Sequence, residues 1–399
     1  MNPFCHRYTY NVACVVPKRV VRFITTNFTA TESNVDVTAA STSAPRPATE
    51  FRKEFQYSRP IFWYPSHQTK ALKQLKDGIH HIDLVVEVRD ARIPLTSINH
   101  QFDHFLANRE RIVVYNKADL ANANMRKPLT DALRQYRNED AVFTCANNGL
   151  HVKKILSKAI EKCRNNPERY PYLSMIIVGI PNVGKSSLIN SLRRLGVKKG
   201  KVTAVGKIAG VTTAIQTRVK IFDDPPIYLV DTPGIYDPHV SSPMEGLKIS
   251  LTGGTRDRLT EELHVADYLL FRLNTSANIK KYPAALGLEH PTDQIYDVLR
   301  HICRTNHFLL DKRGRLFDLT VSKELPSTDK HMPLASSTVD PGSIPDSHLD
   351  IDRAARYMLD KYREGMFGPM TLDDCSLDHL KETLTGWRPG SEHDAELES

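Results

Sequence analysis

The stretch Gly179-Ile-Pro-Asn-Val-Gly-Lys-Ser186 decides the fold of this 399-residue chain. It has the pattern G-x-x-x-x-G-K-[ST], in which the glycines let backbone N–H groups curl around phosphate oxygens. The apolar run Leu173–Ile180 predicts a buried strand before the turn, and Lys185–Leu195 predicts a helix after it. A strand, a glycine-rich turn and a helix in this order are the context that a phosphate-binding loop requires. The sequence therefore predicts a nucleoside triphosphate site at this turn.

The residues of this turn have separate expected roles in holding a nucleotide. Lys185 is expected to contact the β- and γ-phosphates, where its charge would assist catalysis, and the Ser186 hydroxyl is expected to bind Mg²⁺. The positive end of the helix that starts at Lys185 adds to the attraction for phosphate. The residues expected to line the nucleotide here are Asn182, Val183, Gly184, Lys185, Ser186 and Ser187.

Two further motifs after this turn are expected to sense the γ-phosphate. Asp231-Thr-Pro-Gly234 follows the apolar run Ile227–Val230, where a P-loop protein carries its second Mg²⁺-associated carboxylate. Asp231 is therefore expected at the metal, and the Gly234 N–H at the γ-phosphate, where it would bind GTP and support catalysis. Before this motif, Thr212 is the expected threonine ligand of Mg²⁺, with Thr213 as the alternative. A plain turn leading into a strand is the competing interpretation of these threonines.

Asn116-Lys-Ala-Asp119, which follows the apolar run Arg111–Tyr115, predicts that the base is guanine. The Asp119 carboxylate would accept hydrogen bonds from the ring N1–H and the 2-amino group, whereas adenine would leave this charge unpaired. Asn116 would contact the base and brace the phosphate-binding turn, and the Lys117 stem would lie over the ring. The next predicted strand ends in a short motif that is expected to contact the base through its backbone, at Cys145, Ala146 and Asn147.

These motifs stand in an unusual order along the chain. In ordinary GTPases the guanine motif comes after D-x-x-G, whereas here it precedes the phosphate-binding turn and no second N-K-x-D follows Gly234. Strands alternate with helices only up to about Tyr236, and the residues beyond are predicted to be helical. The predicted fold is α/β, with a P-loop GTPase domain of circularly permuted motif order, a parallel-rich sheet and helices on both faces. A small all-helical C-terminal domain is expected to follow.

Composition divides the chain into three parts. Residues 1–47 are rich in basic and hydroxyl side chains, and the first acidic residue is Glu32, which is typical of a mitochondrial transit peptide. A disordered tail is the alternative for this segment. We expect the GTPase domain at 48–255 and the helical domain at 256–399, with a flexible loop at 323–347 that lacks periodicity. No apolar run approaches the ~20 residues of a transmembrane helix, so none is expected.

The net charge of +8 is unevenly distributed. Residues 343–399 carry 13 acidic and six basic side chains, so the rest of the chain is strongly basic. A basic body is typical of proteins that bind a polyanion, and RNA is the expected partner. Two basic groups are candidate RNA contacts, with a solvated surface as the alternative for each. They are Arg353, Arg356, Lys361 and Arg363 on one predicted helix, and Lys198, Lys199, Lys201 and Lys207 beside the first switch.

Several further stretches accompany the nucleotide motifs. They are Trp63-Tyr-Pro-Ser-His67, Asp90-Ala-Arg-Ile-Pro-Leu95, Val265-Ala-Asp-Tyr-Leu-Leu270, Asp352-Arg-Ala-Ala355, Tyr362-Arg-Glu-Gly365, Gly368 and Thr371-Leu-Asp373. With them the chain resembles the circularly permuted ribosome-assembly GTPases of the YlqF/RbgA type. The resemblance implies binding to a precursor of the large ribosomal subunit, hydrolysis stimulated by the ribosome and a helical C-terminal domain that contacts RNA. Ser66, Gln68 and Ala209 replace the family's glycine, methionine and proline, which puts loop geometry in question.

The resemblance also implies catalytic roles. Ile235 stands where many GTPases carry the glutamine that orients water, so slow intrinsic turnover is expected. His67 matches a family histidine that is proposed to act on water, and a structural histidine is the alternative. Asn182 resembles the asparagine that binds K⁺ beside the phosphates in related GTPases. Mg²⁺ and K⁺ are therefore the expected ions.

Together these observations predict a mitochondrial factor that assists maturation of the large ribosomal subunit. GTP or GDP, that subunit and its rRNA are the expected partners, and nucleotide state is expected to reposition the helical domain. The matrix is the expected location, with peripheral association with the inner membrane as an alternative. Two other functions remain open: a GTP-dependent scaffold or translation regulator that hydrolyses little GTP, and a GTPase acting on tRNA or membranes.

Overall fold

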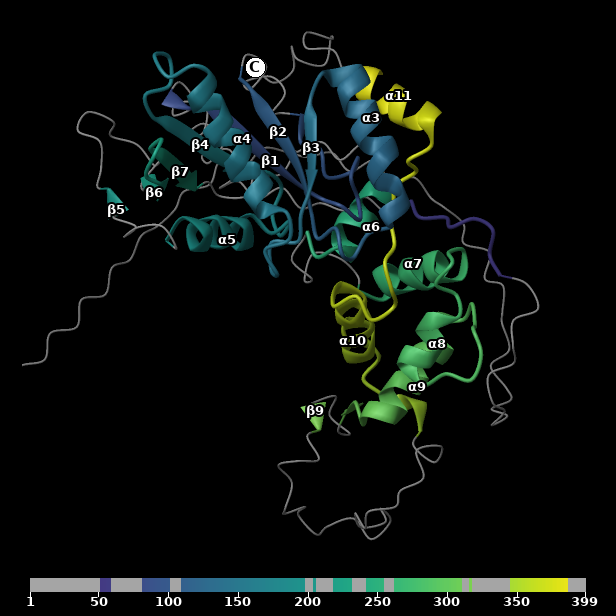
Figure 1. The fold of residues 1–399 in the computed structure, drawn as a ribbon. Helices are drawn as coiled ribbons and strands as arrows, with labels where there is room; N and C mark the ends of the chain where they lie inside the picture. The colour runs from purple at the N-terminus through teal and green to yellow at the C-terminus, as the bar shows by residue number, and fades with distance from the viewer. Residues whose placement is uncertain are drawn as a thin grey trace, which may run out of the picture. The chain divides into compact units, whose positions relative to one another are not determined.

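The structure of the protein is a computed structural model, and Figure 1 colours its described residues along the chain. The described residues are 51–58, 81–100, 109–197, 204–205, 218–231, 242–254, 262–310, 316–317 and 345–386. The chain divides into two compact units, residues 1–44 and 45–399. The first unit lies outside the described residues, as do the expected transit peptide at 1–47 and most of the expected loop at 323–347.

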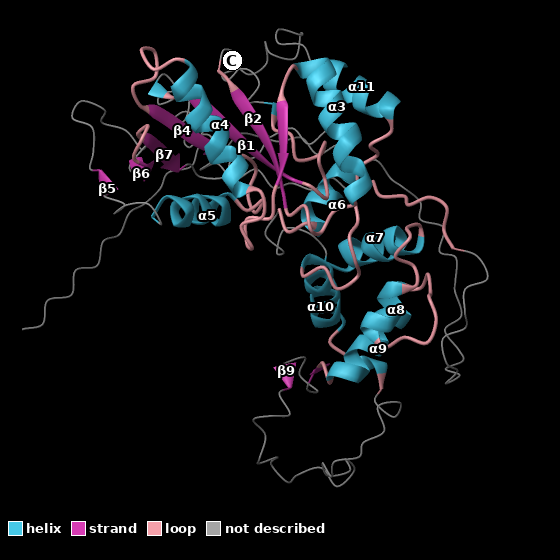
Figure 2. Cartoon of the chain, in the orientation of Figure 1, coloured by secondary structure: helices cyan, strands magenta, loops and turns pink. Residues whose placement is uncertain are grey.

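A seven-stranded sheet forms the centre of the nucleotide-binding half, in the order β3-β2-β1-β4-β7-β6-β5 (Figure 2). Its strands are β1 (Leu84–Asp90), β2 (Arg111–Asn116), β3 (Asp140–Phe143), β4 (Leu173–Val178), β5 (Ala204–Val205), β6 (Arg218–Phe222) and β7 (Ile227–Asp231). The five strands from β3 to β7 in this order run parallel, and β6 and β5 add an antiparallel edge. Every residue of β1 and β4 is buried, as expected of parallel strands that are covered on both faces.

The sheet order explains how permuted motifs make one site. The strands β1, β2 and β3 come first in the chain, and β2 and β3 carry the guanine motifs at their carboxyl ends. Strand β4, which leads into the phosphate-binding turn, then inserts between β1 and β7. Because ligands bind at the carboxyl ends of parallel strands, all of these turns lie along one edge of the sheet. The predicted permuted, parallel-rich α/β fold is confirmed.

Helices cover both faces of the sheet. Alternate residues of the strands, such as Val86 and Met175, pack with α4 (Val152–Asn165) and α5 (Lys185–Val197) in one core. The opposite face, including Val113, packs with α3 (Arg126–Arg137) and with α11 (Leu377–Gly386). The last described helix of the chain therefore belongs to the core of the guanine-binding half.

The helices between β7 and α11 form a second packed group, which Figure 1 shows in green to yellow. They are α6 (Pro243–Leu251), α7 (Glu262–Asn274), α8 (Lys281–Leu286), α9 (Ile295–Asn306) and α10 (Ile351–Arg363). The sequence patterns predict helices at 261–273, 294–305, 350–364 and 377–385, which correspond to α7, α9, α10 and α11, but they miss the two short helices α6 and α8. One difference from an all-helical segment is a pair of two-residue strands, β8 (Leu309–Leu310) and β9 (Leu316–Phe317).

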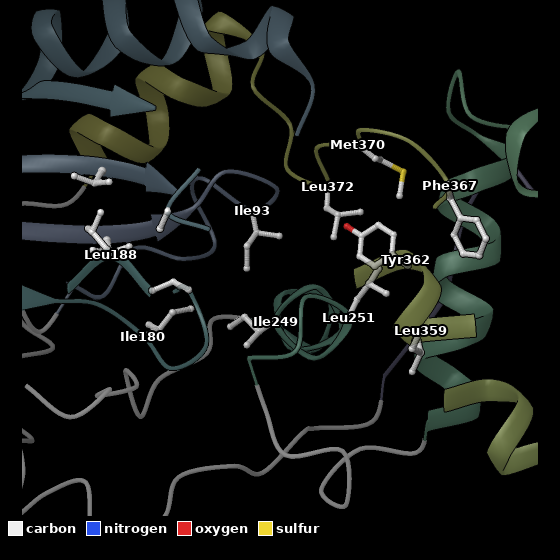
Figure 3. Packing of buried hydrophobic residues seen from close by; sticks show 14 of the residues in the cluster. Ile93, Ile180, Leu188, Ile249, Leu251, Leu359, Tyr362, Phe367, Met370 and Leu372 are labelled. Carbon is white, nitrogen blue, oxygen red and sulfur yellow. The ribbon is translucent and has the colours of Figure 1, made fainter. Parts of the chain in front are cut away.

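The segment from Met370 to Asp373 ties this group to the nucleotide-binding half. The buried Asp373 carboxylate accepts from the backbone N–H groups of Leu95 and Thr96 at 2.8 and 2.9 Å. It also pairs with the ammonium of Lys248 on α6, at 2.9 Å. Figure 3 shows Met370 and Leu372 in this segment, with Leu251 of α6 and Tyr362 of α10 nearby.

The N-terminal described residues also contact the helical group. Arg52 pairs with Asp267 at 2.7 Å and with Asp293 at 3.0 Å, and Phe55 packs edge-on against Tyr268. Residues on both sides of position 255 therefore pack in both groups. The expected boundary between domains 48–255 and 256–399 remains a prediction.

Truncating Leu384 to alanine should measure how much α11 contributes to stability. Leu384 is 3% exposed and packs in the core with α3, so the loss of its side chain leaves a cavity. We expect Leu384→Ala to lower the free energy of unfolding by about 2–5 kcal/mol in urea titrations. The matched control is Leu377→Ala on the same helix, which is 72% exposed and should cost less than about 0.5 kcal/mol. Equal effects would contradict this packing.

Candidate guanine nucleotide site

The phosphate-binding turn is packed tightly against its neighbours. Gly179 has a φ of +146°, and a Cβ there would lie 2.3 Å from the Val88 carbonyl oxygen of β1. Gly184 has a φ of +97°, and a Cβ there would lie 2.2 Å from the Asn116 amide nitrogen. The Lys185 ammonium donates to the Ile180 carbonyl at 2.9 Å, so it lies across the turn. Glycine at both positions is therefore a steric requirement of the site.

Asn116 joins the guanine-binding and phosphate-binding halves. Its side chain is buried, and its Nδ2 donates to the Val183 carbonyl of the phosphate-binding turn at 2.8 Å. Its Oδ1 accepts from the Ala146 N–H at 2.9 Å and from the Thr144 hydroxyl at 3.2 Å. One amide thus fixes three turns relative to each other. The Ala146 N–H, which sequence reasoning assigned to the base, is in this structure bonded to Asn116.

Lys117 extends along the turn from the next position. Its ammonium donates to the Asn182 carbonyl at 2.7 Å and pairs with the Asp90 carboxylate at 3.0 Å. Burial lowers the pKa of Lys117, while the carboxylate of Asp90 acts in the opposite direction. These two contacts hold the Lys117 stem beside the phosphate-binding turn, where it would flank a bound base.

Asp119 and Cys145 come together at the outer end of this site. Asp119 is exposed, so its carboxylate is open to an incoming base. Burial raises the pKa of the Cys145 thiol, and the neighbouring Asp119 carboxylate raises it further. Asn147 is exposed beside them. The residues predicted to recognise guanine therefore lie at one place, at the ends of β2 and β3.

The expected Mg²⁺ ligands are described only in part. Asp231 ends β7 and pairs in register with Ile177 of β4, two residues before the phosphate-binding turn. Ser186 is exposed in the first turn of α5. Both positions are therefore at the edge of the sheet where a metal bound to phosphate would lie. Thr212, Gly234 and His67 lie outside the described residues.

Asn182, expected at K⁺, makes a contact that the sequence did not indicate. It is exposed at the tip of the turn, and its Nδ2 donates to the Gly253 carbonyl at 2.7 Å. Gly253 follows α6, the first described helix after the switch at 231–234. The phosphate-binding turn thus touches the segment that leads into the helical group.

Sequence reasoning gave no role to two buried charges beside Lys117. Asp90 ends β1, and Arg92 follows it in the turn; both side chains are at most 2% exposed. In the sequence they belong to the stretch Asp90–Leu95, which contributes only to the family resemblance. The available signal was an acidic residue just after the apolar-rich run Ile82–Val88, since a buried carboxylate needs a partner.

Comparison with known proteins identifies the family. Residues 174–305 match the model of a family described as 50S ribosome-binding GTPase. Mitochondrial GTPase 1 of Aedes aegypti is 34% identical over 324 residues, which span 78% of this chain and 93% of the relative. The chain belongs to the mitochondrial GTPase 1 family. Mitochondrial ribosome-associated GTPase 1 of Bos taurus is 32% identical over 315 residues, or 78% of this chain and 88% of that one.

A solved structure was also found. The crystal structure of GNP-bound YlqF from T. maritima has a TM-score of 0.48 at 20% identity, covering 77% of this chain and 99% of that chain.

Membership of the mitochondrial GTPase 1 family settles the coarse predictions. The protein is a GTP-hydrolysing enzyme of mitochondria, and Mg²⁺ is the ion that such GTPases use. The predicted family resemblance, enzyme class and mitochondrial location are confirmed. Within the described residues, no helix has the length and apolar character that a membrane span needs.

Adding a methyl group at Gly184 should disable the site. The new Cβ would meet Asn116 Nδ2, and the left-handed backbone itself would be strained by about 1–3 kcal/mol. We expect Gly184→Ala to weaken GTP and GDP binding by at least about tenfold, measured with fluorescent nucleotides. Gly386→Ala is the control, because nothing lies within 4 Å of its Cβ. Unchanged affinity in Gly184→Ala would refute the role of this close approach.

Proposed function

We propose that the protein hydrolyses GTP on precursors of the mitochondrial large ribosomal subunit and so assists their maturation. The observation that carries this proposal is a permuted guanine site in a chain whose relatives are named mitochondrial ribosome-associated GTPase 1. The net charge of +8 supports rRNA as the surface that the protein contacts. The matrix is the proposed compartment, with peripheral association with the inner membrane as the alternative.

For the nucleotide, we propose that Ser186, Asp231 and Thr212 hold Mg²⁺, and that the Gly234 N–H contacts the γ-phosphate. Mg²⁺ would neutralise charge on the phosphates when bound. The positions of Ser186 and Asp231 at the carboxyl edge of β4 and β7 support this assignment. Lys185 and residues 182–187 of the turn would surround the phosphates.

For catalysis, we propose that K⁺ binds beside Asn182 and that His67 acts on the attacking water. The bond from Asn182 Nδ2 to the Gly253 carbonyl fixes the orientation of the amide. The Oδ1 atom is then the one that would bind the ion. Ile235 has no hydrogen-bonding side chain, which supports a need for groups outside the second switch.

For RNA binding, the contacts of α10 distinguish among its basic residues. Arg363 donates to the Ser250 and Leu251 carbonyls at the end of α6, and Arg356 pairs with Glu262. Arg353 is exposed, and its guanidinium lies 4.4 Å from the centre of the Phe308 ring. We therefore propose Arg353 rather than Arg363 as the main RNA contact on this helix.

Two other basic candidates remain. Within the described residues, Lys361 pairs with Glu364, which directly follows α10, and exposed pairs of this kind are weak. Its charge is therefore also available to RNA. The lysines at 198, 199, 201 and 207 lie outside the described residues and stay candidates.

The coupling between nucleotide and the helical group is proposed to run through α6. This helix begins at Pro243, twelve residues after the switch aspartate Asp231, and Ser242 caps it by accepting from the Glu245 N–H at 3.3 Å. Arg363 of α10 binds carbonyls at its other end. A switch that shifts α6 on losing the γ-phosphate would therefore move the contact with α10.

The proposed function predicts ribosome-stimulated hydrolysis. The mature chain should hydrolyse GTP slowly alone, and purified mitochondrial large subunits should accelerate it by at least about tenfold. Replacing K⁺ by Na⁺ should lower the stimulated rate. Phosphate release measured with and without subunits tests both expectations. GTP binding with no stimulation would favour the scaffold function, and stimulation that is equal in both salts would reject K⁺ at Asn182.

The coupling predicts a nucleotide-dependent change in α10. Hydrogen exchange of α10 should differ between the GTP-analogue and GDP states, because α6 contacts this helix through Arg363. Arg363→Gln should abolish the difference, whereas Arg356→Gln, on the same helix but paired with Glu262, should keep it. Identical exchange patterns in the two nucleotide states of the wild-type protein would refute the coupling.

A further inference from the structure

Two buried ion pairs of the same spacing lie along β1 and its following turn. In each, an acidic residue is followed two positions later by its arginine: Glu87 with Arg89 at 2.7 Å, and Asp90 with Arg92 at 2.8 Å. All four side chains are at most 2% exposed. Buried ion pairs are weak evidence for a stabilising role, because desolvation offsets their attraction. Their surroundings distinguish the two.

The Asp90 carboxylate is held in one orientation. Arg92 binds it in a fork, with Nε donating to Oδ1 at 3.0 Å and Nη2 to Oδ2 at 2.8 Å. The Arg92 backbone N–H adds a third bond to Oδ1, at 3.0 Å. Burial alone would raise the pKa of Asp90, but the charges of Arg92 and Lys117 outweigh it and hold the pKa below its ordinary value. The carboxylate is therefore charged and fixed.

That fixed carboxylate faces the guanine motif. Asp90 Oδ2 lies 3.0 Å from the Lys117 ammonium, and the Ala91 N–H donates to the Asn116 carbonyl at 2.9 Å. A lysine side chain is flexible and has no preferred direction of its own. Here the same ammonium group contacts both the Asp90 carboxylate and the Asn182 carbonyl. These two acceptors define where the Lys117 stem lies.

Arg92 in turn is held by elements of the helical group. Its Nη2 also donates to the Thr252 carbonyl at 3.1 Å, just after α6. Its guanidinium lies 5.5 Å from the centre of the Tyr362 ring of α10. In Figure 3, Tyr362 projects from α10 toward the side where Ile93 and Leu372 lie. Arg92 is thus held by Asp90 of β1 and by the end of α6, and it lies beside Tyr362 of α10.

We propose that Asp90, oriented by Arg92, is a positioning residue for guanine recognition: it holds Lys117 in place over the base. The pair sets the affinity for GTP and GDP alike, and its main effect is on binding rather than on the chemical step because Asp90 contacts Lys117 of the guanine motif. This inference rests on a guanine nucleotide as the ligand.

The other pair on β1 shows what a merely structural pair looks like. Glu87 binds Arg89 and also Arg111 at 3.0 Å, and Arg89 Nη1 lies 3.5 Å from the Tyr115 hydroxyl. None of these residues belongs to a nucleotide motif. Glu87 and Arg89 therefore provide a control with the same spacing and the same degree of burial, from the strand on which Asp90 lies.

The test compares two double variants by fluorescent-nucleotide binding and steady-state hydrolysis. Asp90→Asn with Arg92→Met removes both charges of the pair, so no unpaired arginine or carboxylate remains from it. We expect about tenfold or greater weakening of GTP and GDP binding, a matching rise in KM and little change in kcat. Glu87→Gln with Arg89→Met should stay within about threefold of wild type. Wild-type affinity in the first double variant would overturn the proposal, as would an equal loss in both.

A double-mutant cycle tests whether Asp90 acts through Lys117, and it provides a second variant of Asp90 in case the first double variant fails to fold. Asp90→Asn removes the charge but keeps the shape of the side chain and an oxygen that can accept from Arg92. It should weaken binding in the wild-type background but change it less than about twofold in the Lys117→Met background. Equal losses in the two backgrounds would overturn the proposal. Circular dichroism and urea unfolding check that each variant is folded. Absence of GTP binding by the wild-type chain would instead reject the proposed function itself.

Discussion

The amide of Asn116 is the interaction on which the rest of the nucleotide site depends. It is 2% exposed, and it bonds the phosphate-binding turn through Val183 and the end of β3 through Thr144 and Ala146. In a permuted chain the guanine half precedes the phosphate half, so covalent connectivity does not set their alignment. An unpaired buried amide costs about 1–3 kcal/mol, which favours the one arrangement that satisfies it. Gly184 is then required, because any side chain there would occupy the space of Asn116.

The end of α6 is a second place where distant parts of the fold contact each other, and we propose that it serves regulation rather than base recognition. Four consecutive carbonyls, from Ser250 to Gly253, accept hydrogen bonds from side chains that come from different parts of the fold. Those side chains are Arg363 of α10, Arg92 of the turn after β1 and Asn182 of the phosphate-binding turn. The last carbonyls of a helix lack partners within the helix, so they are available for such contacts. Permutation places this helix directly after the switch, between the nucleotide and the helical group.

The C-terminal residues do not form a separate appendage to the sheet. Leu380 and Leu384 of α11 pack with α3, and Asp373 binds backbone N–H groups of the turn after β1. Residues near the other end of unit 45–399 act similarly, since Arg52 pairs with Asp267 and Asp293. These crossing contacts make the helical group part of the surroundings of the nucleotide site. Under the proposed coupling through α6, movement of α10 and nucleotide affinity would be linked in both directions, as any coupling of two sites requires.

The sequence by itself determined the class of protein, the identity of the base and the permuted order. Those features follow from local patterns: Gly179 and Gly184 at fixed spacing, N-K-x-D after an apolar run, and strands that alternate with helices. It also located the longer helices α4, α5, α9 and α10 to within a few residues, because each has an amphipathic period, and α7 because of its long apolar-rich run. The family likeness then pointed to the ribosome, which no spacing could have done.

Only the tertiary structure decided which of these groups touch. The short helix α6 has no strong periodicity of apolar residues, so the sequence pattern did not predict the helix or its contacts. Likewise, Asp90 and Lys117 are 27 positions apart, and the bonds from Arg363, a candidate RNA contact, to carbonyls of α6 span more than 100 positions. The physical reason is that hydrogen bonds and ion pairs between distant residues depend on how strands and helices pack. Local propensity fixes each element, whereas the partner of a buried charge is fixed by the fold that surrounds it.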